Sequence, residues 1–84
     1  MARFNVPIEG EDLDRAWAAF NGTPGIETVG RPLEARFASP EGGRTGRLLI
    51  AALRADTAID AEARAREALP KGEYVVGQAE EYGD

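Results

Sequence analysis

Apolar and polar residues alternate in the first segment of the chain, from Arg3 to Ile8. Phe4, Val6 and Ile8 fall on one side, which is typical of a half-buried strand with one face on the core. Pro7 has no backbone donor, so we expect the pairing of this strand to be incomplete at that position.

The apolar spacing then changes from two residues to three and four, which predicts a helix from Glu11 to Asn21. Its inner stripe consists of Leu13, Ala16, Trp17 and Phe20. Gly22 is placed to end the helix in a left-handed conformation, and Thr23-Pro24-Gly25 marks a break.

Two further strands follow, predicted at Ile26 to Ser39 and at Thr45 to Ala55. Gly30-Arg31-Pro32 allows a bend in the earlier one, and Pro40-Glu41-Gly42-Gly43 is typical of a hairpin loop. The later strand contains the unbroken apolar run from Leu48 to Leu53, which favours a central strand covered on both faces. A helix is the competing interpretation of this run, but the flanking glycines and the hairpin loop favour a strand.

A second helix is predicted to begin at Asp56-Thr57, because Thr57 and Asp60 have the spacing of a capping box. Its inner stripe is small and consists of Ala58, Ala61, Ala65, Ala68 and Leu69. Pro70-Lys71-Gly72 ends the helix, and a last strand is expected from Glu73 to Ala79. Residues 80–84 are acidic and are expected to form a tail that is free to fray.

The order strand, helix, strand, strand, helix, strand resembles the ferredoxin-like superfold, in which two βαβ units share a sheet. We therefore expect one α+β domain over residues 1–84: a ferredoxin-like βαββαβ sandwich with a four-stranded antiparallel sheet and both helices on one face. Many unrelated functions occur on this superfold, so the resemblance by itself implies no function.

Composition narrows the chemistry that the chain can perform. The 84 residues include no cysteine and no histidine, and Ser39 is the only serine. Disulfides, thiolate metal sites and a Ser-His-Asp triad are therefore excluded, and we expect no cofactor, no metal and no enzymatic activity. The chain also lacks an apolar run of membrane-spanning length and a signal-peptide pattern, so we expect a cytoplasmic protein without a membrane partner.

Nucleic acid is not an expected partner either. The net charge of −5 opposes phosphate binding. An RNA-recognition motif has the same element order, but it stacks bases on aromatic residues that the strand from Gly46 to Leu53 lacks. The glycines at 42, 43 and 46 precede a strand, which favours a hairpin turn over a phosphate loop.

The apolar run from Leu48 to Leu53 carries the functional prediction. In a strand its side chains point alternately to two faces, and the helices cover only one of them. If Leu48, Ile50 and Ala52 face the helices, the other three form an exposed apolar patch, and the reverse register leaves a patch as well. The predicted interface residues are Leu49, Ala51, Leu53, Arg36, Val75 and Tyr82.

We therefore expect a non-enzymatic interaction module that forms a homodimer or binds a partner protein, through its open sheet face or through an edge strand. The alternative is a small-molecule-binding dimer or a minor enzyme that uses carboxylate or tyrosine groups. Its polar candidates are Asn5, Arg36, Tyr74 and Gln78. A buried carboxylate in a deep pocket would favour this alternative, and a flat apolar face would favour the interaction module.

Overall fold

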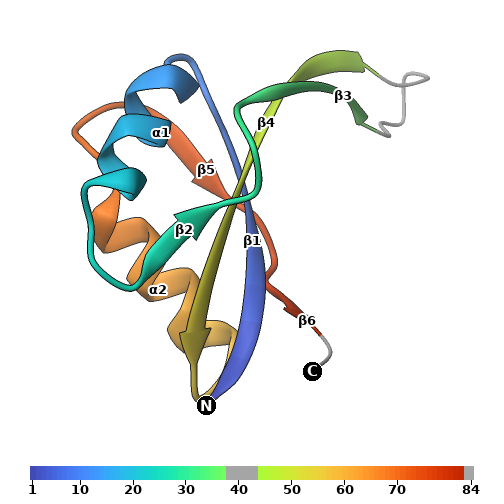
Figure 1. The fold of residues 1–84 in the computed structure, drawn as a ribbon. Helices are drawn as coiled ribbons and strands as arrows, with labels where there is room; N and C mark the ends of the chain where they lie inside the picture. Colours follow the sequence, from blue (N-terminus) through green and yellow to red (C-terminus); the bar gives the residue numbers. More distant parts are fainter. Residues whose placement is uncertain (38–43, 83–84) are drawn as a thin grey trace.

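The computed structural model describes residues 1–37 and 44–82, so the predicted hairpin loop at 40–43 lies outside the described residues. The elements are β1 (Ala2–Gly10), α1 (Leu13–Asn21), β2 (Ile26–Thr28), β3 (Leu33–Phe37), β4 (Arg44–Ala55), α2 (Ala58–Ala68), β5 (Tyr74–Val76) and β6 (Glu80–Tyr82). Both helices lie on the same side of the sheet (Figure 1). The predicted α+β class is confirmed.

The sheet is antiparallel throughout and has six strands in the described part of the chain, where four were expected. β4 and β1 pair along the middle. β2 and β3 both pair with the outer side of β4, and β5 and β6 both pair with the outer side of β1. The predicted strand from Ile26 to Ser39 is thus present as β2 and β3, whereas β5 covers part of the predicted last strand and β6 lies in the segment that was expected to be a tail.

Pro7 explains the break between β5 and β6. Ile8 pairs with Val76 and Asn5 pairs with Glu80, so two residues of β1 lie opposite three residues, 77–79. The Gly77 N–H donates to the Pro7 carbonyl at 2.8 Å, but Pro7 has no N–H to return. A proline within a sheet is tolerated at such a bulge, so the incomplete pairing expected at Pro7 is observed. Pairing then resumes through Tyr82, over the first residues of the expected tail.

The break between β2 and β3 is larger and falls at the predicted bend. Four residues, 29–32, lie opposite two residues of β4, 49 and 50. The Val29 N–H still donates to the Ile50 carbonyl at 2.9 Å. Arg31 leaves the strand and places its guanidinium 5.0 Å from the centre of the Trp17 ring on α1.

The helix ends follow local signals with one exception. Thr57 caps α2 by accepting from the Asp60 N–H at 3.1 Å, as predicted, and Asp12 caps α1 by accepting from the Arg15 N–H at 3.1 Å. The expected left-handed cap at Gly22 is wrong, because its φ is −89°. The left-handed residue is Gly25, with φ +87°, in a turn closed by the Ile26 N–H on the Thr23 carbonyl. Proline before a glycine of positive φ favours a type II turn, so the reversal occurs three residues after Gly22.

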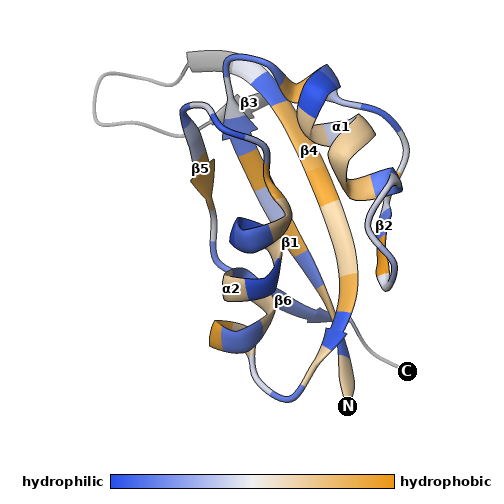
Figure 2. Cartoon of the chain, turned by 90° about the vertical axis from the view of Figure 1, so that its left-hand side faces the viewer, coloured by the Kyte–Doolittle hydropathy of each residue, from blue (hydrophilic) through white to orange (hydrophobic). Residues whose placement is uncertain are grey.

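The core lies between the helices and one face of the sheet. β1 contributes Phe4, Val6 and Ile8, the helices contribute Leu13, Ala16, Phe20, Ala61 and Ala65, and β4 contributes Leu49, Ala51, Leu53 and Ala55. In the view from the helical side, the apolar stretch of β4 is seen between α1 and α2 (Figure 2). The run from Leu48 to Leu53 therefore lies in a central strand, as expected, and the competing helix is wrong. The expected cover on both faces is not observed, because the helices cover one face only and Leu48 and Ile50 on the other are partly exposed.

Candidate functional site

The orientation of β4 decides which of its apolar residues are available to a partner. Leu49 and Ala51 are 0% exposed and Leu53 is 4% exposed, all three beneath the helices. Their prediction as surface residues is wrong, because Leu49 pairs with Ile8 and Leu53 with Phe4, whose side chains face the core. The reverse register applies, and Leu48 and Ile50 point to the open face.

The open face carries an apolar patch at the end nearest β3. Leu48 pairs with Leu33, Ile50 lies beside Val29, and Val75 extends from β5. Val29 and Leu33 are each 51% exposed and Val75 is 61% exposed, whereas Leu48 and Ile50 are partly exposed. We call these five residues the open-face patch. Val29, Leu33, Leu48 and Ile50 adjoin one another, whereas Glu9 of β1 lies between Val75 and β4, because it pairs with Val75 and follows Ile8, the partner of Leu49. Adjoining exposed apolar side chains mark interaction sites more often than isolated ones do.

Two of the five patch residues, Leu33 and Leu48, lie on a projecting ribbon. β1 pairs with β4 only from Leu49 onward, so residues 44–48 pair with β3 alone in the described part of the chain. The ribbon extends away from the helices (Figure 1). In the described part of the chain, a salt bridge of 3.3 Å between Arg47 and Asp14 connects the ribbon to α1. A two-stranded ribbon gains little stability alone in water, so this ribbon would gain from a surface packed against it.

The other predicted interface residues have different environments. Val75 and Tyr82 are exposed, as an interface requires, and the Arg3 guanidinium lies 5.5 Å from the centre of the Tyr82 ring. Arg36 lies in β3, but its side chain is outside the described part of the structure. Tyr82 is at the end of β1 far from the open-face patch, because it pairs with Arg3.

Both edges of the sheet are poor templates for a further strand. β2, β5 and β6 have three residues each, and bulges separate them from the next stretch of pairing. Short, interrupted edge strands are a common protection against edge-to-edge pairing. β3, the remaining edge strand, has five residues. Association through the open face and association through an edge strand both stay predictions.

The polar candidates for a small-molecule site do not converge. The Tyr74 hydroxyl donates to the Asp12 carbonyl at 2.8 Å, which ties β5 to the start of α1. Asn5 lies on the open face, and Gln78 lies in the bulge opposite Pro7. Among the side chains that the structure describes, no polar or charged residue is buried, and no cluster of acidic residues could hold a metal ion.

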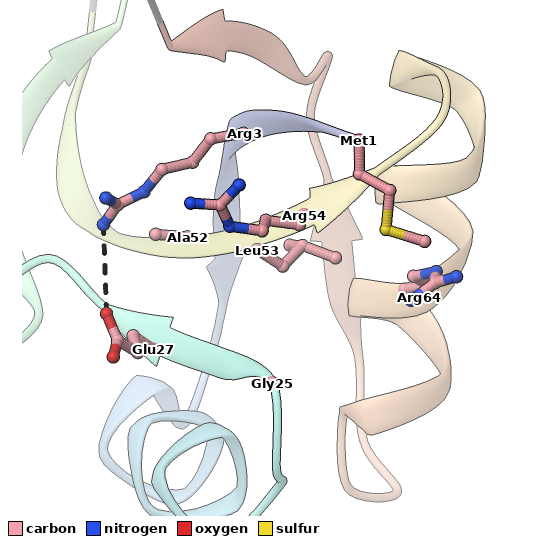
Figure 3. A pocket seen from close by; sticks show the side chains of 8 residues that line it. All are labelled: Met1, Arg3, Gly25, Glu27, Ala52, Leu53, Arg54 and Arg64. Carbon is pink, nitrogen blue, oxygen red and sulfur yellow. Dashed lines mark ion pairs between the residues drawn. The ribbon is translucent and has the colours of Figure 1, made fainter. Parts of the chain in front are cut away.

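A second feature lies at the opposite end of the sheet. Where β2 begins, a surface depression of about 440 Å³ contains three arginines, Arg3, Arg54 and Arg64, from β1, β4 and α2 (Figure 3). Glu27 is the one carboxylate in its lining, and it approaches Arg3 at 3.8 Å. An adjoining depression of about 260 Å³ shares Arg54 and Arg64.

The sequence alone indicated neither the grouping of these arginines nor the exposed positions of Val29 and Leu33. Arg3 and Arg54 are 51 positions apart and become neighbours only through the β1–β4 register. Val29 and Leu33 are apolar residues of the predicted second strand. The face of the sheet to which each side chain points depends on how many residues between them are left unpaired in the bulge. Neither the register nor the bulge has a local signal that determines it.

No protein-family model, curated protein or solved structure matches this chain. In the described part of the chain, no helix combines the length and apolar character needed to cross a membrane.

Proposed function

We propose that the protein is a non-enzymatic interaction module that self-associates through the open face of its sheet. The observation that carries this proposal is the open-face patch, whose Val29, Leu33 and Val75 are all at least half exposed. An apolar surface of this kind is stabilised when a second surface removes it from water.

A second copy of the chain is the occupant that fits best. A symmetric dimer places the same patch on both sides of the interface, so apolar side chains meet apolar side chains. The chain has 84 residues and a correspondingly small core, which association would supplement. The projecting ribbon, β3 with the start of β4, would gain the packing surface that it lacks in the monomer.

The arrangement of the sheet supports a finer description of the fold. If β2 with β3 and β5 with β6 are each counted as one bulged strand, the order across the sheet is last, first, third, second. This is the order expected from two interleaved βαβ units, and we propose that the fold is a ferredoxin-like βαββαβ sandwich with its outer strands broken by bulges.

The test is sedimentation or light scattering of the wild-type chain and two variants, Leu33→Glu and Val75→Glu, over a wide concentration range. Both side chains are largely exposed, so the substitutions should leave the monomer folded. We expect a wild-type dimer and a dissociation constant raised at least about tenfold in each variant, since each buries a charge in an apolar interface. Ile59→Glu is the matched control, because Ile59 is 79% exposed on α2, in the layer of helices.

Two results would contradict self-association through this face. One is a wild-type chain that stays monomeric up to millimolar concentrations. The other is a dimer that Ile59→Glu weakens as much as Leu33→Glu does. Because two protomers of net charge −5 repel each other, the dimer should also strengthen with added salt.

The alternative function, a small-molecule binder or a minor enzyme using carboxylate or tyrosine groups, has less support. Proton transfer by a carboxylate near neutral pH requires burial or a close charged partner that changes its acidity. No described carboxylate is buried, and the Tyr74 hydroxyl is already engaged by the Asp12 carbonyl. Binding of a small molecule without catalysis needs no such group, and the depression around Arg3, Arg54 and Arg64 is the candidate for it.

A further inference from the structure

We propose that the depression around Arg3, Arg54 and Arg64 binds the phosphate group of a small phosphorylated molecule. The first observation is the position of Arg3 and Arg54, which are direct partners in the β1–β4 ladder and lie on the same face of the sheet. Like charges directly opposite each other on a sheet are destabilising. An anion bound between the guanidinium groups of Arg3 and Arg54 attracts both of them and so offsets their mutual repulsion.

The second observation is that the surrounding carboxylates do not neutralise the three arginines. Glu27 contacts Arg3 only at 3.8 Å, and its side chain is 80% exposed. Asp60 pairs with Arg64 at 3.3 Å within one exposed turn of α2, a kind of ion pair that contributes little. The Arg54 guanidinium has neither a hydrogen bond nor an ion pair in the described part of the chain.

The third observation is that parts of the site are already held in place. The Arg3 guanidinium lies between the Tyr82 ring, at 5.5 Å, and Glu27. Figure 3 shows Arg3 and Arg54 over the sheet and Arg64 on the α2 side of the same depression. Gly25, which has no side chain, leaves the rim open. Positioned arginines of this kind bind tetrahedral oxyanions through several parallel N–H donors.

Charge and size together favour phosphate over a single carboxylate. Three arginines and Glu27 leave two positive charges in the lining, and a phosphate monoester carries about −1.5 to −2 at neutral pH. The volume of about 440 Å³ exceeds that of a bare ion and lies in the range of small-molecule sites. An organic group attached to the phosphate can lie against Met1, which is 70% exposed. The net charge of −5 opposes a long nucleic acid as the source of the phosphate.

This site is independent of the proposed self-association. Arg54 lies four residues beyond Ile50, the nearest patch residue on β4, a distance of about 13 Å along an extended chain. A variant of one site should therefore leave the other intact, and either proposal can fail alone.

The test is a titration followed by NMR at constant ionic strength, with inorganic phosphate and ribose 5-phosphate as probes and chloride as the reference. We expect saturable shifts of the Arg3, Arg54 and Arg64 resonances, with tighter binding of ribose 5-phosphate. Arg54→Ala should weaken binding at least tenfold. Arg66→Ala removes an exposed arginine of α2 that lines none of the described depressions, and it should change binding less than twofold.

Two further measurements separate a built site from diffuse attraction. Glu27→Gln removes the competing carboxylate and should tighten binding several-fold. Arg54→Ala without ligand should melt at a higher temperature than the wild type, because a like-charge contact is removed, and phosphate should stabilise the wild type more than this variant. Circular dichroism of each variant verifies that it is folded.

The proposal is overturned by the absence of saturable shifts at tens of millimolar phosphate, or by equal weakening in Arg54→Ala and Arg66→Ala. Much tighter binding of a short single-stranded oligonucleotide than of ribose 5-phosphate would also overturn it, because the phosphate source would then be a nucleic acid.

Discussion

Leu48 and Leu49 are adjacent and chemically identical, yet the structure assigns them opposite faces of β4. Leu49 is 0% exposed beneath the helices, whereas Leu48 is partly exposed in the open-face patch. Leu49→Ala removes three buried carbon atoms and leaves a cavity, a change that costs about 3–4 kcal/mol of unfolding free energy. Leu48→Ala removes the same atoms from a site that water already reaches, so about 1 kcal/mol is expected.

Thermal and urea unfolding of the two variants measures this difference directly. In a chain of this size, 1 kcal/mol corresponds to about 4–8 °C in Tm, so Leu49→Ala should melt roughly 12–30 °C below the wild type. Leu48→Ala should melt within about 8 °C of it. The measurement is made at low micromolar concentration, so that association does not contribute. Equal losses, or a larger loss in Leu48→Ala, would refute the assigned orientation of β4.

Substitutions at three further positions probe the features that position the sheet and α2. Gly77→Ala places a Cβ 2.8 Å from the Pro7 ring, and we expect a loss of about 1–3 kcal/mol in urea unfolding; a neutral result would contradict the tight contact at the bulge. Thr57→Ala removes the cap of α2 and should cost about 1 kcal/mol, whereas Thr57→Ser should retain most of it. Glu62→Ala leaves the Ala79 N–H without its 3.0 Å acceptor, a loss of about 1–2 kcal/mol that Glu62→Gln should partly restore. If Glu62→Gln is no better than Glu62→Ala, the hydrogen bond to the bulge is not what stabilises it.

Much of the fold could be predicted because its signals are local. The alternation from Phe4 to Ile8 predicted β1, and the spacing of Leu13 and Phe20 predicted α1. Thr57 gave the start of α2, since its hydroxyl lies three residues before the N–H that it accepts from. In each case the residues that form the contact are within a few positions of one another.

The interface prediction was harder because both faces of the Leu48–Leu53 run are apolar. Either set of alternate residues could have faced the helices, so periodicity alone could not distinguish them. The pairing of Leu49 with Ile8 selected one set, and it buried three of the six predicted interface residues. Of the other three, Val75 and Tyr82 are exposed, and the Arg36 side chain lies outside the described part of the structure.

The amino-acid order thus determined most of the segments that become strands and helices, with β6 as the exception. It also determined where Pro7 and Gly30-Arg31-Pro32 interrupt the pairing, because these features depend on backbone geometry within a few residues. Only the tertiary structure decided which face of β4 the helices cover and that Arg3 lies beside Arg54. Both outcomes depend on strand register, and register is set by the packing of the whole sheet against its helices.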